Sequence, residues 1–378
     1  MSGSIHQVHG MAGQCEAAHW PPLTAAETAA LLVRYPAIHD PLEITWHSPR
    51  PLSAACLVRS ADATVFVKRH HVGVRSVATL GEEHCFMDHL RDRGVPIPRV
   101  LADGNGERAV RIGDWVYEVH AQAAGDDTYR DTISWAAPDS IAHARTAGTM
   151  LARLRAAAAS YLAPQRSTHL LVARAELLCA DDPVATLEVQ LPARPALGAY
   201  LSRRNWKAEL ATTLAPWHGA LRGRLQQQPV QWTHGDWHVS NLCWSGVGDA
   251  ANITAVLDFG LAAATFALFD LATAIERNAI AWLALDTGHA VARIGIALAV
   301  IEGYRRAAAL NAADVHLLAD LLPLVHLDFA LSEVEYLHAT GHAPAAADVA
   351  YDTFLRGHAA WFTTPAGQSL LAAIHGVA

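Results

Sequence analysis

The sequence has little positive charge, no long uninterrupted apolar run and no regular set of cysteines. Its 378 residues include 28 Lys and Arg against 36 Asp and Glu, which gives a net charge of −8. Such a balance does not present the generally basic surface that binds nucleic acid. The most apolar helical stretch, 294–301, is much shorter than the roughly 20 residues that span a bilayer, and charge flanks it. We therefore expect neither nucleic acid nor a membrane as a partner.

Cysteine and histidine usage excludes further classes. The N-terminus lacks the basic segment and apolar run of a secretory signal. Although there are 22 histidines, no spaced pair is accompanied by an acid at the helical spacing of a zinc protease. The cysteines are odd in number and scattered, which argues against a disulfide framework and indicates a reducing compartment, so we expect a cytoplasmic protein. They are Cys15, Cys56, Cys85, Cys179 and Cys243.

Length and composition favour a helix-rich globular protein with two lobes, because a chain of this length exceeds one ordinary core. Residues 1–20 contain Gly, His and Ser and are expected to be disordered. A capping-box pattern after Pro21 and Pro22 opens the first helix. The regular pattern breaks again within 121–139. We therefore expect an N-lobe at 21–122 and a larger C-lobe at 123–378.

Two short segments in the second half of the chain carry chemistry. Residues 233–241 read Thr-His-Gly-Asp-Trp-His-Val-Ser-Asn, and residues 256–260 read Val-Leu-Asp-Phe-Gly. The five-residue step from Asp236 to Asn241 suits a short loop, and an apolar strand-like run delivers Asp258. Kinases use this spacing: the first Asp orients a substrate hydroxyl, while the Asn and the second Asp supply hard oxygens to Mg²⁺. Isolated Asp residues usually serve turns and caps, but that interpretation leaves the spacing unexplained.

In order and spacing, these segments resemble the aminoglycoside phosphotransferase and choline kinase superfamily, the small-molecule relatives of protein kinases. Gly235 stands where protein kinases have an arginine. The resemblance implies an α+β, two-lobed, protein-kinase-like fold with a small β-rich N-lobe and a larger helical C-lobe. It also implies ATP and Mg²⁺ as cofactors. Asp236 would then be the catalytic base, and Asn241 and Asp258 would bind the metal ion.

The same resemblance places the nucleotide-binding residues in the N-terminal part. Residues 64–68 alternate as a strand that ends at Lys68, where kinases have the lysine that contacts the α- and β-phosphates. A helix-like stretch fifteen residues further on contains Glu82 and Glu83, one of which should pair with Lys68. Glu83 is favoured because it precedes Leu90 by seven residues, which matches the superfamily pattern.

The loop that would cover the phosphates departs from the kinase pattern. Residues 47–58 contain no glycine, and no Walker-type Gly-Lys-Ser/Thr run occurs elsewhere. Ser53, through its hydroxyl, is the candidate phosphate contact in this loop. The resemblance places the adenine-binding hinge on the strand that contains Glu118 and His120. Main-chain groups there are the candidates, although main-chain recognition leaves no side-chain signature.

Beyond the motif, the C-terminal part reads as almost entirely helical. Asp270 stands at the start of one helix, where it would either cap the helix or, as in relatives, brace the catalytic loop. Residues 325–336 form an amphipathic helix with Asp328, Glu333 and Glu335 among apolar residues. These acids form either a solvated face, the more common arrangement, or part of the wall of the acceptor pocket.

A second resemblance leaves the acceptor open. Glu-His-x-Phe at 83–86 and His-Gly-Asp-x-His-x-x-Asn-x-x-Trp at 234–244 resemble the bacterial stress-response kinase group, which phosphorylates Ser and Thr on proteins. That group usually lacks the Phe-Gly found here after Asp258. We expect phosphoryl transfer to the hydroxyl of a small molecule, such as an aminoglycoside, amino alcohol, sugar or related metabolite. The alternatives are a protein Ser/Thr kinase and a nucleotide-binding pseudokinase. The sequence leaves the oligomeric state open.

Overall fold

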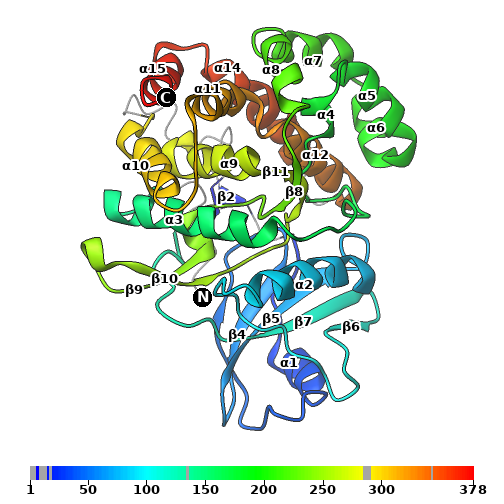
Figure 1. Cartoon of the computed structure of the whole chain (residues 1–378). Helices are drawn as coiled ribbons and strands as arrows, with labels where there is room; N and C mark the ends of the chain where they lie inside the picture. Colours follow the sequence, from blue (N-terminus) through cyan, green and yellow to red (C-terminus); the bar gives the residue numbers. More distant parts are fainter. Residues whose placement is uncertain (1–5, 8–14, 17–18, 133–135, 284–290, 342–343) are drawn as a thin grey trace.

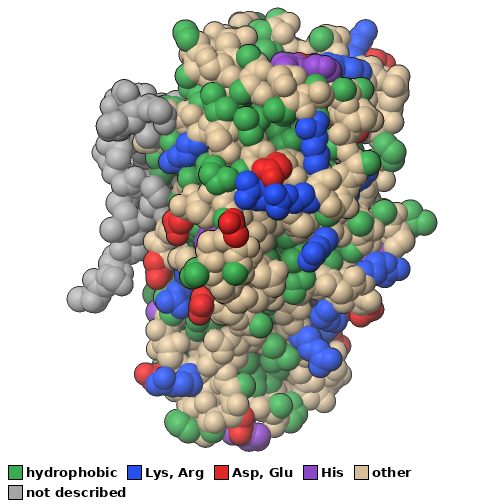
Figure 2. Space-filling view, turned by 60° about the vertical axis from the view of Figure 1, so that its left-hand side comes forward, with side chains coloured by type: hydrophobic (Ala, Val, Ile, Leu, Met, Phe, Trp, Pro, Cys, Tyr) green, Lys and Arg blue, Asp and Glu red, His purple; other side chains and the backbone are tan. Residues whose placement is uncertain are grey.

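The chain folds into a small lobe built around a β-sheet and a larger, mostly helical lobe (Figure 1). The structure is a computed structural model that describes residues 6–7, 15–16, 19–132, 136–283, 291–341 and 344–378. The arrangement confirms the expected α+β, two-lobed, kinase-like fold. On the face shown in Figure 2, basic and acidic side chains are interspersed.

An antiparallel five-stranded sheet forms the small lobe, in the order β3-β4-β5-β7-β6. Its strands are β3 (Glu43–His47), β4 (Ala54–Arg59), β5 (Thr64–His71), β6 (Ala109–Ile112) and β7 (Trp115–Ala121). Two helices, α1 (Ala25–Leu32) and α2 (Val77–Arg91), complete this lobe. Val65 and Val67 of β5 share one apolar cluster with Leu31 of α1. Because successive side chains of a strand alternate, Lys68 and His70 point to the opposite face of the sheet.

The larger lobe holds the remaining elements. Its strands form two antiparallel pairs, β8 (Val230–Thr233) with β11 (Ala263–Phe266), and β9 (Leu242–Ser245) with β10 (Asn252–Val256). The helices are α3 (Ile141–Ala158), α4 (Glu176–Cys179), α5 (Pro183–Gln190), α6 (Pro195–Leu201), α7 (Trp206–Leu214), α8 (His218–Leu225), α9 (Ala267–Ala279), α10 (Ile294–Arg305), α11 (Ala312–Leu321), α12 (Leu327–Thr340), α13 (Pro344–Asp348), α14 (His358–Trp361) and α15 (Pro365–His375). Short 3₁₀ turns η1 (Leu191–Ala193), η2 (Val239–Asn241), η3 (Gly248–Ala250) and η5 (Leu322–Leu324), and a π-helix η6 (Val349–Gly357), connect them.

Helices α3 and α10 approach closely through glycine. A Cβ atom at Gly148 would lie 2.1 Å from the carbonyl oxygen of Val300, and one at Gly303 would lie 1.8 Å from that of Arg145. Only a residue without Cβ fits at either position. Since α3 also contacts α9, β8 and β10, this tight pair supports the elements that carry the motif.

One apolar run is longer than the sequence suggested. Ala312–Thr340, which joins α11, η5 and α12, has 29 residues and is apolar enough to span a membrane by length and composition. The expectation that no such stretch exists was therefore wrong. Within the structure, 83% of the most apolar window of this run is buried. The run is thus a core segment of the larger lobe.

Part of the N-terminal stretch is ordered against the rest of the chain. The strands β1 (His6–Gln7) and β2 (Cys15–Glu16) pair with each other. His19 and Trp20 both contact the hydroxyl of Tyr336 at 3.1 Å, and Trp20 stacks on His71. The expectation of disorder is therefore wrong at residues 19 and 20, because their rings bury against α12 and β5. Residues 1–5, 8–14 and 17–18 lie outside the described part of the chain.

Candidate active site

Two adjoining cavities lie where the lobes meet. The interlobe cavity, of about 510 Å³, is bounded by β4, β5, β7, residues 121–128 and the segment that ends in Asp258. The second cavity, of about 200 Å³, lies beside it and is bounded by the catalytic loop, α9, α12 and η6. Residues that line both cavities mark their junction: Arg50, Ser53, Lys68, Asn241 and Asp258.

The catalytic loop, residues 234–241, follows β8, and Asp270 of α9 binds its first two residues. Its carboxylate accepts hydrogen bonds from the main-chain N–H groups of His234 and Gly235, each at 2.7 Å. Helix α9 is preceded by Phe266 at its N-cap, without a side-chain cap. Asp270 therefore braces the loop and does not cap the helix. His234 contacts the carbonyl oxygen of Leu257 through Nε2 at 2.9 Å, which ties the loop to the strand end before Asp258.

The surroundings of Gly235 leave no room for a side chain such as the arginine that protein kinases have at this position. Its φ of +78° is in the left-handed region, and a Cβ would lie 2.7 Å from both the Cβ of Ala173 and the carbonyl oxygen of Leu261. A larger side chain would therefore displace the loop or its neighbours. The residue is needed for backbone shape.

Asp236 lines the second cavity beside Arg277 and His238. Arg277 Nη2 lies 3.3 Å from its Oδ1, and His238 Nε2 lies 3.4 Å from its Oδ2. Burial alone would raise the pKa of Asp236, but Arg277 and His238 outweigh it and hold the pKa well below its usual range. The side chain is therefore an anionic acceptor throughout the physiological pH range. Arg277 was missed in the sequence, although it follows Asp270 by two helical turns on α9 and so shares its face.

Asn241 and Asp258 present oxygen ligands at the cavity junction. The side-chain amide of Asn241 donates to the main-chain oxygen of Asp236 at 3.0 Å, which leaves its Oδ1 as the group available to a cation. Asp258 follows β10, as expected from the sequence, and has a φ of +53°. No group of three or more His, Cys, Asp or Glu in the described ranges is arranged to hold a metal ion.

Lys68 pairs with Asp258, which differs from the predicted partner. Its Nζ donates to Asp258 Oδ1 at 3.0 Å, whereas Glu83 has an ion contact with Arg166 Nη2 at 3.8 Å. Burial alone would lower the pKa of Lys68, but the carboxylates of Asp258, Glu118 and Glu83 raise it. Lys68 thus has several neighbouring anions, and Asp258 is the one within hydrogen-bonding distance.

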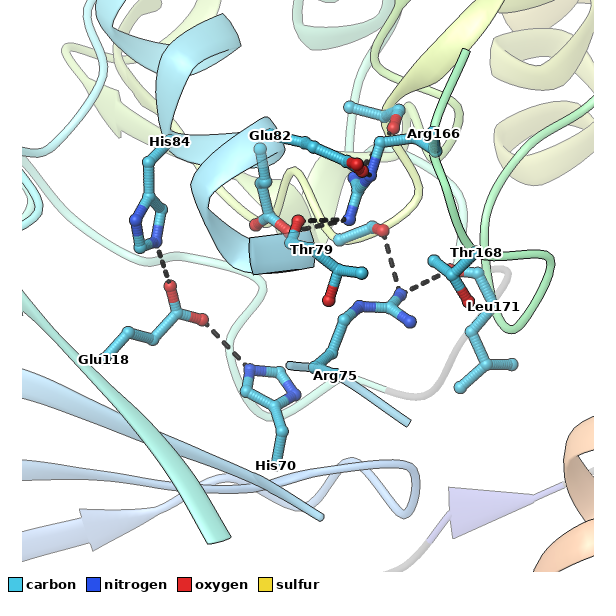
Figure 3. A network of polar contacts seen from close by, with 12 residues as sticks. His70, Arg75, Thr79, Glu82, His84, Glu118, Arg166, Thr168 and Leu171 are labelled. Carbon is cyan, nitrogen blue, oxygen red and sulfur yellow. Dashed lines mark hydrogen bonds and ion pairs between the residues drawn. The ribbon is translucent and has the colours of Figure 1, made fainter. Parts of the chain in front are cut away.

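The two candidate glutamates of α2, Glu82 and Glu83, have different contacts. Glu82 accepts from Arg166 Nε at 3.1 Å and from the main-chain N–H of Ser167 at 3.2 Å, as Figure 3 shows for Arg166. Glu83 lines the interlobe cavity, and its buried Oε2 has no hydrogen-bond partner. Of the two glutamates, Glu83 is therefore the one that lines the interlobe cavity together with Lys68.

Glu118 has a structural partner set that the sequence did not reveal. Its buried carboxylate lies 3.0 Å from His70 Nε2 and 2.8 Å from His84 Nε2 (Figure 3). It also lies 3.0 Å from His120 Nε2. Burial would raise the pKa of Glu118, but His120, His70 and His84 lower it strongly. The cluster links β5, β7 and α2 directly behind Lys68.

The expected hinge positions require a correction. Glu118 is paired with Lys68 on one side and with Ala109 on the other, and His120 lies between Phe66 and Val100, so strands flank both residues. Their main-chain groups are used within the sheet. The strand ends at Ala121, and in the described chain the N–H groups of the next two residues, Gln122 and Ala123, have no hydrogen-bond partner. Both residues line the interlobe cavity.

A buried arginine joins the small lobe to the segment after Asp258. Arg75 donates to the carbonyl oxygens of Leu170 and Leu171, each at 2.7 Å, and of Gly260 at 3.1 Å. It precedes α2 and is labelled in Figure 3 beside Leu171. Burial lowers the pKa of Arg75 to about 10, and Arg166 adds to this effect. No sequence signal marked Arg75, because its partners are carbonyl groups.

The acids of α12 are not a solvated face. Asp328 is buried and accepts from the main-chain N–H of Leu177, while Glu335 pairs with buried Arg194 at 2.6 Å. Glu333 lines the second cavity together with Phe329 of the same helix. Of the three acids, Glu333 therefore lines a cavity, whereas Asp328 and Glu335 bind groups inside the larger lobe.

A strand lysine, a short loop with Asp and Asn, and a second Asp after a strand, all lining one cavity pair, define a kinase-like phosphotransferase. Residues 52–310 match the sequence family described as the phosphotransferase enzyme family, and the chain belongs to that family. This agrees with the resemblance to aminoglycoside phosphotransferases. No curated protein matches the sequence.

Solved structures share the fold at low sequence identity. An amicoumacin kinase in complex with AMP-PNP, Ca²⁺ and its antibiotic is 14% identical, with a TM-score of 0.55, over 86% of this chain and 91% of that one. A microcompartment-associated aminopropanol kinase is 17% identical, with a TM-score of 0.55, over 88% and 98%. A spectinomycin phosphotransferase in complex with ADP and spectinomycin is 11% identical, with a TM-score of 0.52, over 94% and 98%.

Proposed function

We propose that the protein transfers the γ-phosphoryl group of ATP to a hydroxyl of a small molecule, with Mg²⁺ as the metal ion. The observation that carries this proposal is the junction of the two cavities. Lys68, Asn241 and Asp258 line both, while Asp236 lines the second cavity alone. A nucleotide in the interlobe cavity would thus present its terminal phosphate to an acceptor held beside Asp236.

Nucleotide binding in this proposal uses main-chain and charged groups. The N–H groups of Gln122 and Ala123 would bind the adenine edge, and Lys68 would contact the α- and β-phosphates. Glu83 would hold Lys68 in place. Ser53 remains the candidate hydroxyl contact, since it lines both cavities. The relatives crystallised with AMP-PNP or ADP support nucleotide use.

The oxygens of Asn241 and Asp258 fit a hard cation. Mg²⁺ usually takes one or two protein oxygens and fills its remaining positions with phosphate and water, so this donor set is sufficient. When bound, the ion would neutralise negative charge on the phosphates. Asn241 would keep its orientation through the hydrogen bond to Asp236 described above.

Asp236 would orient the acceptor hydroxyl and receive its proton. Its low pKa makes it a weak base, but phosphoryl transfer depends chiefly on position and charge, and proton removal occurs late. Arg277 and His238 hold the carboxylate in place from both sides.

The acceptor belongs in the second cavity. At about 200 Å³ this space suits a small alcohol or part of a larger one, and it combines aromatic Phe329 with charged Glu333 and Arg277. The relatives include kinases of amicoumacin, aminopropanol and spectinomycin, so an amine-bearing alcohol is a reasonable first choice. A cytoplasmic location is part of the proposal, because ATP is supplied there.

The test compares wild type with Asp236→Asn and with Asp249→Asn as a matched control, since Asp249 is 96% exposed in η3. Calorimetry measures Mg-ATP binding, and ADP release is measured against a panel of amino alcohols, sugars and aminoglycosides. Asp236→Asn should bind ATP normally and lose about 10²–10⁴-fold in turnover. Turnover near that of wild type would reject Asp236 as base. Wild type that binds ATP but phosphorylates only protein, or nothing, would reject the small-molecule acceptor.

A further inference from the structure

The loop between β3 and β4 has few main-chain N–H groups that could bind phosphate. Residues 48–53 read Ser-Pro-Arg-Pro-Leu-Ser. Pro49 and Pro51 have no N–H group, and the N–H of Arg50 is donated to Ser48 Oγ at 3.3 Å. A phosphate-binding cradle needs successive N–H groups that point to one place. Within 48–53 the only successive residues that both have an N–H group are Leu52 and Ser53, so the loop offers a short cradle for a chemical reason that goes beyond its lack of glycine.

Arg50 reaches from this loop across the cavity junction. Its Nη2 donates to Ser240 Oγ, in the catalytic loop, at 3.0 Å. It lines both the interlobe cavity and the second cavity, and Lys68 is the other cation that does so. The proline on each side fixes its own φ and restricts the conformations of the loop, so the loop that presents the guanidinium is stiff.

The anchoring of Arg50 continues to the proposed base. Ser240 Oγ lies 2.6 Å from His238 Nδ1, and His238 Nε2 lies 3.4 Å from Asp236 Oδ2. Asp236 and Asp258 are also charged neighbours of Arg50. The guanidinium is therefore held at the point where the phosphate and the acceptor oxygen would meet.

We propose that Arg50 is a catalytic residue whose guanidinium binds the γ-phosphate of ATP and compensates for the small number of main-chain N–H groups in this loop. The inference rests on the proposed function. A planar guanidinium presents paired N–H donors that match phosphate oxygens. In the proposed function Lys68 contacts the α- and β-phosphates, so Arg50, which lies nearer the acceptor side, binds the γ-phosphate.

During transfer, the bond from the γ-phosphorus to the β–γ bridging oxygen breaks and ADP leaves. The bond to the acceptor oxygen forms, and the hydroxyl proton passes to Asp236. Arg50 holds non-bridging oxygens of the moving group throughout, where negative charge is concentrated in the transition state. Ser240 shares the guanidinium and limits its movement.

The test is the difference between ATP and ADP binding, which needs no acceptor. Calorimetry with Mg²⁺ is carried out on wild type, Arg50→Met and Arg50→Lys. The control is Arg59→Met, which removes the same charge from the same hairpin, where Arg59 is 61% exposed and pairs with Glu43. Arg50→Met should weaken ATP binding by about 10- to 100-fold and ADP binding by less than about 3-fold. Arg50→Lys should restore only part of the ATP affinity, and Arg59→Met should match wild type.

Three results would overturn the assignment. Equal losses for ATP and ADP would place Arg50 on the inner phosphates or in the fold, and melting temperatures of the nucleotide-free variants separate these two. Unchanged affinity for both nucleotides would remove Arg50 from the site while leaving the proposed function intact. Wild type that binds neither nucleotide would reject the proposed function and this inference together.

Discussion

Asp270 Oδ1 accepts a hydrogen bond from the main-chain N–H of Gly235 at 2.7 Å, and its second oxygen does the same for His234. One carboxylate therefore fixes two consecutive peptide groups directly before Asp236. The backbone at Gly235 is left-handed, which a residue without Cβ adopts readily. The direction in which Asp236 points thus depends on a residue of α9 that touches neither cavity.

Asp270→Asn should lower both stability and turnover. The new side chain keeps one acceptor oxygen but turns an NH₂ group towards a main-chain N–H, so one buried donor loses its partner. We expect a loss of about 1–3 kcal/mol in the free energy of unfolding and a decrease of about tenfold or more in kcat, with unchanged ATP affinity.

Denaturant unfolding, calorimetry and ADP release measure these three quantities, and exposed Asp249→Asn serves as control. If Asp270→Asn loses stability but keeps the wild-type kcat, the brace does not orient Asp236.

The sequence predicted the residues of the motif because side-chain chemistry and spacing are local. Asp236 and Asp258 come shortly after the strands β8 and β10, and Asn241 directly precedes β9. The proposed hinge is different, because Gln122 and Ala123 would act through N–H groups that every non-proline residue has. The shift from Glu118 to Gln122 follows from where β7 ends, which depends on pairing with β5 and β6.

The partners in ion pairs could not be predicted from the sequence either, because several charged side chains that are distant in the chain compete for one partner in the folded structure. Lys68 has Asp258, Glu118 and Glu83 as charged neighbours, and spacing along the chain does not rank them. The acids of α12 were ambiguous for the same reason. Arg194, which pairs with Glu335, lies 141 positions earlier in the chain.

Lys68 should become more reactive when Asp258 loses its charge. An amine is acylated only in its neutral form, and the adjacent carboxylate raises the pKa of Lys68. In Asp258→Asn this pKa should fall, and acylation should rise about tenfold for each unit of change. The chain has two lysines, so half-exposed Lys207 is an internal reference.

Mass spectrometry after brief treatment with an acylating ester at pH 8 gives the ratio of Lys68 to Lys207 modification. Mg-ATP should reduce this ratio in wild type. An identical ratio in wild type and Asp258→Asn would show that the Lys68–Asp258 pair does not persist in solution.

Asp328 should make stability depend on pH. Its Oδ2 is buried without a hydrogen-bond partner, and burial, helped by Glu176, raises the pKa of Asp328 to about 7. An unfolded Asp titrates near pH 4. The protonated folded form therefore contributes stability that is complete below about pH 4 and is lost as the pH rises through about 7.

Asp328→Asn mimics the protonated acid at every pH. The free energy of unfolding of wild type, relative to this variant, should fall by roughly 1–3 kcal/mol from pH 5 to pH 8. Denaturant unfolding at both pH values measures the change, with Asp249→Asn as control. A constant difference across this range would mean that Asp328 titrates elsewhere.

Arg75 should control how well Asp258 is presented to the metal ion. Two described non-glycine residues have a positive φ, Leu171 and Asp258. Arg75 donates to the carbonyl oxygen of Leu171 itself and to that of Gly260, two residues after Asp258. Ser332 of α12 accepts from the N–H of Leu171 at 2.6 Å, so the same point is tied to the acceptor side. The guanidinium of Arg75 therefore binds main-chain oxygens at or close to both residues with a positive φ, Leu171 and Asp258.

Arg75→Lys keeps the charge but lacks the fork that reaches several carbonyl groups at once. We expect a loss of about 2–4 kcal/mol in stability, since at least one buried carbonyl loses its donor, and a several-fold increase in the Mg²⁺ concentration at half-maximal turnover. Metal titrations at saturating ATP measure the second effect, and exposed Arg111→Lys is the control. A merely structural role would lower stability without moving the metal dependence. Wild-type Mg²⁺ dependence in folded Arg75→Lys would therefore exclude Arg75 as the residue that positions Asp258.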